Sequence, residues 1–172
     1  MRRTMLLLAA AVLATSCSNE APSEAAFAIE TEPAMPGEPT GFTATGEAVA
    51  EELLCLSGDA AWTQTLHADT GLPETPENPP RDGETLWVET RFTCSDGNGD
   101  FTLRAEAVVD FAELDESFAT GEPLGPHPIS AIAGTGDYGN LEVDGSREWV
   151  PVTPGDFDDG FTEIFSGTLT RG

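Results

Sequence analysis

The chain has 172 residues, of which 39% are apolar and 22% are charged, so it is long enough for one domain of ordinary size. Acidic residues number 31 against 7 basic ones, and the net charge of −24 excludes a nucleic-acid-binding protein, because contacts to phosphates need a cationic surface. The apolar fraction also excludes a wholly disordered chain. No motif specifies a chemical reaction, and the sequence says more about location and fold.

Residues 1–16 have the features of a bacterial secretion signal. Arg2 and Arg3 precede an apolar run that ends at Leu13, and small residues follow up to Ser16. The apolar run is about half the ~20 residues that a transmembrane helix needs. We therefore expect a signal peptide that is removed.

The residues around Cys17 carry a first resemblance. Leu13-Ala14-Thr15-Ser16-Cys17 resembles the lipobox of bacterial lipoproteins, with the leucine one position further from the cysteine than in that motif. The resemblance implies that Cys17 carries a diacylglyceryl group and acyl chains such as palmitate. Several acyl chains on one residue would anchor the protein durably on the extracytoplasmic face of a bacterial membrane, in the cell envelope. An ordinary secretory signal cleaved near this point is the alternative.

Residues 17–40 predict an acidic, proline-rich, disordered linker. The segment contains several prolines and glutamates and no basic residue, a composition that favours an extended chain. A short apolar patch, Phe27-Ala28-Ile29, interrupts it. We interpret this patch as a chance cluster, and a docking strand is the alternative.

The cysteine count fits a lipid anchor. The chain has three cysteines, so in an extracellular protein one of them cannot form a disulfide within the chain. If Cys17 carries lipid, Cys55 and Cys94 remain as a pair. An oxidising compartment then predicts a disulfide between them. Two buried free thiols are the alternative, and a metal site is disfavoured because neither cysteine has a CxxC partner or a nearby histidine.

Residues 41–172 predict a single all-β domain. Alternating apolar residues on both sides of a turn at residues 96–99 indicate an antiparallel hairpin, with Cys94 on the apolar face of its first strand. The apolar positions are Leu86, Val88, Thr90, Phe92 and Cys94 before the turn, and Phe101, Leu103, Ala105, Ala107, Val109 and Phe111 after it.

About eight strands are expected in this domain. Besides the hairpin, the candidates are residues 42–49, 60–66, 129–133, 138–143, 147–152 and 161–169. Residues 48–56 predict one short turn or helix, and residues 70–83 and 114–128 predict two long loops. Many short strands in one domain predict a small antiparallel barrel or a sandwich, and an eight-stranded barrel is just filled or holds one small ligand.

The order of several segments carries a second resemblance. The segments at 42–49, 54–58, 91–103, 133–138 and 165–169 are similar to those of a group of uncharacterised secreted bacterial proteins, and more distantly to the dirigent and allene oxide cyclase barrels. The resemblance implies an eight-stranded barrel with a Gly-Thr-Gly turn between two late strands. Gly134 and Gly136 then make a tight structural connection, with a phosphate-binding loop as the alternative. No catalytic residue of the plant families can be matched, so their activities are not transferred.

Two groups of polar residues are candidate sites. Asp96, Asn98 and Asp100 have the alternating spacing of calcium ligands, although the rest of an EF-hand is missing and a polar turn is the alternative. His67 and His127 have no metal-ligand partner at short spacing, and we expect both to be loop residues.

These observations predict a lipid-anchored extracytoplasmic barrel without enzymatic activity. It would bind a small apolar ligand or act as a cell-surface interaction module, with the membrane or a basic protein as further partners. A cofactor-independent enzyme of the cyclase or isomerase kind is the alternative. A cavity with convergent polar groups would favour a ligand or a reaction. An interior filled by Phe92, Phe101, Leu103 and Val109 would favour a plain scaffold.

Overall fold

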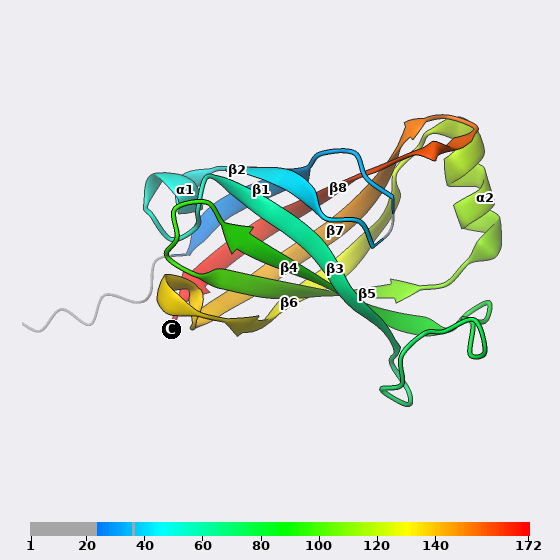
Figure 1. Cartoon of the computed structure of the whole chain (residues 1–172), viewed down its shortest axis with the longest axis horizontal. Coiled ribbons are helices and arrows are strands. Elements are labelled where there is room, and N and C mark those ends of the chain that lie inside the picture. Colours follow the sequence, from blue (N-terminus) through cyan, green and yellow to red (C-terminus); the bar gives the residue numbers. More distant parts are fainter. Residues whose placement is uncertain (1–23, 36) are drawn as a thin grey trace, which may run out of the picture.

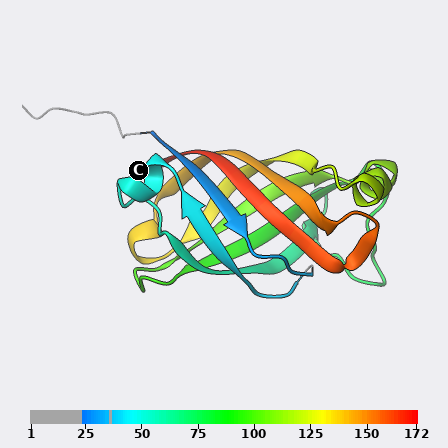
Figure 2. The same ribbon diagram turned by 90° about the horizontal axis from the view of Figure 1, so that it is seen from above.

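Eight antiparallel strands, each hydrogen bonded to its neighbours in chain order, form a closed barrel (Figures 1 and 2). The computed structural model describes residues 24–35 and 37–172, so the expected signal at 1–16 and the lipid site at Cys17 lie outside the described residues. The strands are β1 (Ala25–Thr31), β2 (Thr40–Thr45), β3 (Ser57–His67), β4 (Thr85–Cys94), β5 (Asp100–Val108), β6 (Leu124–Gly134), β7 (Leu141–Thr153) and β8 (Asp156–Arg171). The expected all-β fold and antiparallel barrel are confirmed.

Strand β1 corrects the expected linker at 17–40. Ala25, Phe27, Ile29 and Thr31 are buried and alternate with more exposed residues, as in a half-buried strand. The strand pairs with β2 on one side and with β8 on the other, and the second pairing closes the barrel. The patch around Phe27 is therefore part of the barrel wall, and the domain includes residues before 41.

The barrel has the expected number of strands, eight, but two of the expected strands are parts of a single one. Residues 138–143 and 147–152 do not form separate strands, because β7 runs through the Asp-Gly-Ser segment between them. Gly145 in that segment lies opposite Gly167 of β8, and a Cβ on Gly145 would lie 2.2 Å from the carbonyl oxygen of Ser166. The glycine thus permits a close approach of two strands, where two separate strands were expected from the sequence.

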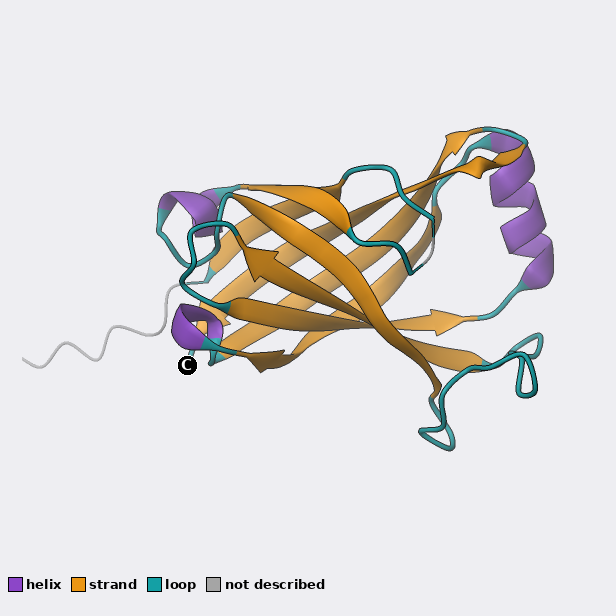
Figure 3. Cartoon of the chain, viewed as in Figure 1, coloured by secondary structure: helices purple, strands orange, loops and turns teal. Residues whose placement is uncertain are grey.

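Three short helical segments connect the strands: α1 (Glu47–Ala50), α2 (Phe111–Thr120) and the 3-10 turn η1 (Gly136–Tyr138) (Figure 3). Helix α1 corrects the expected strand at 42–49, which ends at Thr45. Helix α2 and strand β6 replace the expected loop at 114–128. Across residues 24–35 and 37–172, no helix is long and apolar enough to span a membrane.

Helix α2 starts and stops at recognisable signals. The side chain of Asp110 accepts hydrogen bonds from the backbone N–H groups of Ala112 and Glu113, and Gly121 ends the helix in the left-handed conformation. The ring of Phe118 packs against Phe157, with 4.7 Å between ring centroids. This contact holds the helix beside the β7–β8 hairpin.

Aromatic side chains fill one half of the barrel interior. Phe92 lies at the centre of this core and contacts the rings of Phe42, Phe101 and Phe165 at centroid distances of 4.9 to 5.2 Å. All four side chains are buried, as is Leu103. Edge-to-face and offset-stacked contacts of this kind stabilise a core beyond the burial of their area.

The two ends of the barrel differ in their coverings. Helix α1, the turn η1 and the β4–β5 turn lie at the end where β1 begins, and α2 and the loop at 70–83 lie at the opposite end (Figure 1). We call the end with α1, η1 and the β4–β5 turn the closed end, and the end with α2 and the loop at 70–83 the mouth. The expected surface loop at 70–83 is confirmed, since these residues lie outside the named strands.

Candidate functional site

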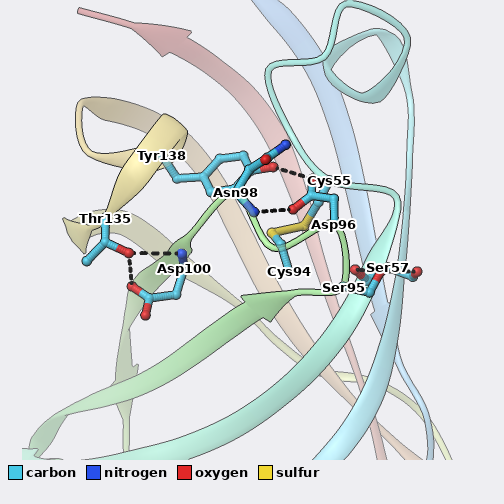
Figure 4. Close-up of a disulfide and its surroundings, with 9 residues drawn as sticks. All are labelled: Cys55, Ser57, Cys94, Ser95, Asp96, Asn98, Asp100, Thr135 and Tyr138. Atoms are coloured by element: carbon cyan, nitrogen blue, oxygen red, sulfur yellow. Dashed lines mark hydrogen bonds between the residues drawn. A yellow bond between two sulfur atoms is a disulfide. The ribbon is translucent and has the colours of Figure 1, made fainter.

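A disulfide joins Cys55 to Cys94 at the closed end (Figure 4). Cys55 follows α1, whereas Cys94 is the last residue of β4, so the bond fastens the α1–β3 connection to the central hairpin. Both residues are buried, at 4% and 5% exposure. The expected disulfide is confirmed.

The carboxylates of the expected calcium site have other partners. Asp96 accepts hydrogen bonds from the backbone N–H of Asn98 at 2.8 Å and from the hydroxyl of Tyr138 at 2.9 Å (Figure 4). Asp100 accepts one from Thr135 at 3.0 Å and also pairs with Arg91. In the part of the chain that the structure describes, no three His, Cys, Asp or Glu side chains are grouped to hold a metal ion. The geometry supports the polar turn, and calcium stays a prediction.

The Gly-Thr-Gly segment forms a tight structural connection, as expected. Gly136 has a φ of 58°, and a Cβ on it would lie 1.9 Å from the carbonyl oxygen of Asn98. A Cβ on Gly134 would lie 2.0 Å from the carbonyl oxygen of Tyr138. Burial, together with the hydrogen bond to Asp96, raises the pKa of Tyr138 to about 12. The phenol therefore stays protonated and ties η1 to the β4–β5 turn.

A cavity of about 310 Å³ lies at the mouth of the barrel. It is framed by the strand ends of β3 to β6, by β7, by the start of α2 and by the loop at 70–83. Its walls are mainly apolar, with a few polar side chains among them. The apolar side chains include Leu86, Val88, Ala107, Val109, Leu114 and Leu124, and the titratable ones are Glu74, Asp110, His127 and Arg147.

A buried ion pair forms the floor below this cavity. Arg147 of β7 donates to the carboxylate of Glu163 on β8, and both side chains point into the barrel at 1% and 8% exposure. The same oxygen, Oε1 of Glu163, accepts hydrogen bonds from the indole N–H of Trp62 at 2.5 Å and of Trp149 at 2.9 Å. One carboxylate thereby connects β3, β7 and β8 across the barrel.

Aromatic rings surround the guanidinium of Arg147. Its central carbon lies 4.5 Å from the ring centroid of Trp149 and 5.1 Å from that of Trp62, and these two rings stack on each other. Cation–π contacts of this kind favour the charged form. Burial lowers the pKa of Arg147, and the negative charge of Glu163 acts against this shift.

The expectation that both histidines are loop residues was wrong. His127 belongs to β6, and its half-buried side chain lines the cavity. Burial and the positive charge of Arg147 lower the pKa of His127, so this imidazole is neutral near pH 7. His127 therefore offers a neutral donor or acceptor beside the guanidinium.

His67 is the last residue of β3 and holds the proline-rich loop. Its Nδ1 lies 2.6 Å from Oε1 of Glu84, and its Nε2 lies 3.1 Å from the backbone oxygen of Asn78. Both partners are acceptors, so the doubly protonated ring can donate to both at once. Glu74 and Pro80 of the same loop line the cavity, so this contact fixes one of its walls.

The contact between His67 and Glu84 predicts a dependence of stability on pH. The hydrogen bond to Glu84 raises the pKa of His67 above 6.5, and the hydrogen bond from His67 lowers the pKa of Glu84 below 4.5. The pair should therefore contribute most between about pH 4.5 and 6.5. As the pH rises from 6.5 through the raised pKa of His67, the free energy of unfolding should fall, which urea unfolding at fixed pH values measures.

Glu84→Gln provides the control for this measurement. It removes the carboxylate that raises the pKa of His67, so the decrease above pH 6.5 should become smaller. His127 does not interfere, because its lowered pKa places its titration below 6.5. An unchanged decrease in the variant would contradict the assignment to this pair.

Comparisons with protein-family models, with curated proteins and with solved structures find no match for this chain. The fold and the site define a closed eight-stranded antiparallel barrel with a packed core at one end and a cavity at the other. The resemblance to secreted bacterial barrels and to the plant families stays a prediction.

The residues at the floor of the cavity were not singled out as a site in the sequence. Trp62, Trp149 and Glu163 lie in segments that were expected to be strands, but the hydrogen bond between Trp62 and Glu163 joins residues 101 positions apart. A signal for Arg147 was present, because it lies at an inward-facing position of β7 in a chain with few basic residues. A basic residue on an apolar strand face needs a buried acidic partner.

Proposed function

We propose that the protein is a lipid-anchored, extracytoplasmic binding protein that holds one small, mainly apolar molecule in the mouth of its barrel. The cavity of about 310 Å³ carries this proposal. Pockets for small molecules begin near ~300 Å³ and combine apolar walls with a few polar groups. The cavity has both features.

The barrel interior combines the two alternatives that the sequence left open. Phe92, Phe101 and Leu103 fill the closed half, whereas Val109 lines the cavity instead of filling it. The packed half gives the walls a rigid support, and a rigid, preformed cavity lowers the entropic cost of binding. This division of the interior favours a binding role over a plain scaffold.

An anchor at Cys17 would orient the barrel. Strand β1 begins at the closed end, opposite the mouth (Figure 1). An extended chain spans at most about 3.6 Å per residue, so the segment between Cys17 and Ala25 would keep the closed end within roughly 30 Å of the membrane. The mouth would then face away from the lipid. Mass spectrometry of the purified mature protein should find acylated Cys17 as its first residue, and an unmodified start would contradict the anchor.

Ethylbenzene is a suitable neutral probe of the cavity. Isothermal titration calorimetry should give one binding site per chain, and the ligand should raise the melting temperature by mass action. Ala107→Phe places a ring inside the cavity, so it should weaken binding at least about tenfold. Ala107 lines the cavity on β5, where the new side chain has room.

Ala133→Phe is the matched control. Ala133 lies on β6 and is exposed, so the same added ring should leave binding unchanged. Equal binding by both variants would show that ethylbenzene does not occupy this cavity. Absence of binding to the unaltered protein would contradict the proposed function itself.

A further inference from the structure

Arg147 is the polar group of the cavity whose bonding is incomplete. Its Nε is fully buried and, among residues 24–35 and 37–172, has no hydrogen-bond partner. A buried donor without a partner is destabilising, so native proteins rarely retain one without a use. Arg147 also lines the cavity, so its guanidinium is a polar group that a molecule bound there would meet.

The charge of Arg147 is already balanced. Glu163 accepts from it but is not one of the residues that line the cavity, so the arginine lies between its counter-ion and the cavity. Trp62 and Trp149 also donate to this carboxylate and help to hold it in place. What the site lacks is a hydrogen-bond acceptor and not a negative charge.

We propose that the ligand is a neutral, mainly apolar molecule with a carbonyl oxygen, and that this oxygen accepts a hydrogen bond from Arg147. This inference rests on the proposed function and adds the chemical class of the ligand. The apolar body would contact Leu86, Val88 and Ala107. His127 stands beside the same end of the cavity and helps to define it as the polar end.

The charges around the cavity argue against a carboxylate ligand. Glu74 and Asp110 line its wall, and Glu163 lies behind Arg147. A carboxylate would add a buried negative charge to a site whose single arginine is already paired, and an unpaired buried charge is strongly unfavourable. A carbonyl oxygen accepts the hydrogen bond without changing the net charge.

The volume of the cavity limits the size of the ligand. A cavity of about 310 Å³ is at the lower end of the range of roughly 300–1,000 Å³ for small-molecule pockets, so its ligand should be small. Ethylbenzene, acetophenone and benzoate are all small and share a flat ring. Acetophenone differs from ethylbenzene essentially by its carbonyl oxygen, and benzoate replaces this group with a carboxylate.

Calorimetric titration of the purified protein with these three compounds tests the inference. Acetophenone should bind roughly 10- to 100-fold more tightly than ethylbenzene, because a hydrogen bond from a charged donor has about this effect. Benzoate should bind more weakly than both. Equal affinities for acetophenone and ethylbenzene, or tightest binding of benzoate, would overturn the inference while the proposed function stands.

The variant Arg147→Met/Glu163→Gln locates the effect. It removes the donor and its counter-ion together, and the glutamine can still accept from Trp62 and Trp149. The readout is the ratio of the two affinities in this variant: acetophenone should lose its advantage over ethylbenzene, whatever the affinity for ethylbenzene itself. A preference for acetophenone that survives in this variant would exclude Arg147 as the donor.

Infrared spectroscopy of acetophenone bound to the unaltered protein gives a measurement that does not depend on any variant. A hydrogen bond from a guanidinium should lower the C=O stretching frequency relative to its value in a hydrocarbon solvent. A hydrocarbon-like frequency in the bound state would overturn the inference. If none of the three compounds binds, the proposed function fails as well, so the two failures are distinguishable.

Discussion

Glu163→Ala should lower the free energy of unfolding by about 3–5 kcal/mol. The substitution takes away the acceptor of Arg147, Trp62 and Trp149 at once. Arg147 is 1% exposed and would keep its charge in the barrel without a partner. Urea unfolding followed by circular dichroism measures the loss as a lower midpoint at an unchanged slope.

Two further variants define what this loss means. Glu142→Ala removes an exposed carboxylate from β7 and should change stability by no more than about 0.5 kcal/mol. Arg147→Met/Glu163→Gln removes both charges, so it should recover more than half of the loss. If Glu163→Ala costs no more than Glu142→Ala, the buried pair has no structural role.

Replacing both cysteines of the disulfide, in the variant Cys55→Ala/Cys94→Ala, should destabilise the protein by about 4 kcal/mol. The bond closes a loop between residues 39 positions apart, and the chain-entropy model gives this magnitude for such a loop. Alanine is chosen because both positions are buried and a serine hydroxyl would need a partner there. Thermal unfolding of the variant should occur at a clearly lower temperature.

Measuring the affinity of this variant for ethylbenzene shows whether the loss of the disulfide affects only stability or also the cavity. The disulfide lies at the closed end and the cavity at the mouth, so the folded variant should bind the compound with unchanged affinity. Unfolding of the unaltered protein in the presence of a reductant should approach the curve of the variant. A variant as stable as the unaltered, oxidised protein would contradict the assigned role of the bond.

The central hairpin could be predicted because its signals are local. Strands β4 and β5 alternate apolar and polar residues on both sides of a glycine-rich turn, and their register joins Phe92 to Phe101. The pairing of Cys55 with Cys94 was predicted from the cysteine count, with Cys17 expected to carry lipid, and from an oxidising compartment. These features depend on neighbours in the sequence or on covalent chemistry.

The elements that were missed had weaker or conflicting local signals. Strand β1 is surrounded by glutamate and proline, so its composition hid the alternation of Phe27 and Ile29. The strand-like alternation of β5 continues to Phe111, the first residue of α2, and so hid the start of the helix. Local signals were present, because Asp110 and Glu113 have the spacing of a capping box and Gly121 is typical of a helix end. In each case a short motif was more informative than the composition around it.

The site could not be assembled from the sequence, because its parts meet only across the closed barrel. Arg147 and Glu163 come from a hairpin, but Trp62 reaches the same carboxylate from β3. Which polar residues face inward depends on the register of each strand, and β3 contains a bulge between Trp62 and Gln64 that changes the inward set. The cavity exists only because these registers together place its lining residues on the inside of the barrel.

The pairing of the first strand with the last one has a consequence for how the chain is made. Ala25 lies opposite Leu169, so the sheet cannot close until synthesis has passed the last strand of the barrel. Before that moment, β1 and the growing end each expose an unpaired edge that could join another nascent molecule. Assembly of this barrel is therefore most vulnerable to aggregation just before its final strand arrives.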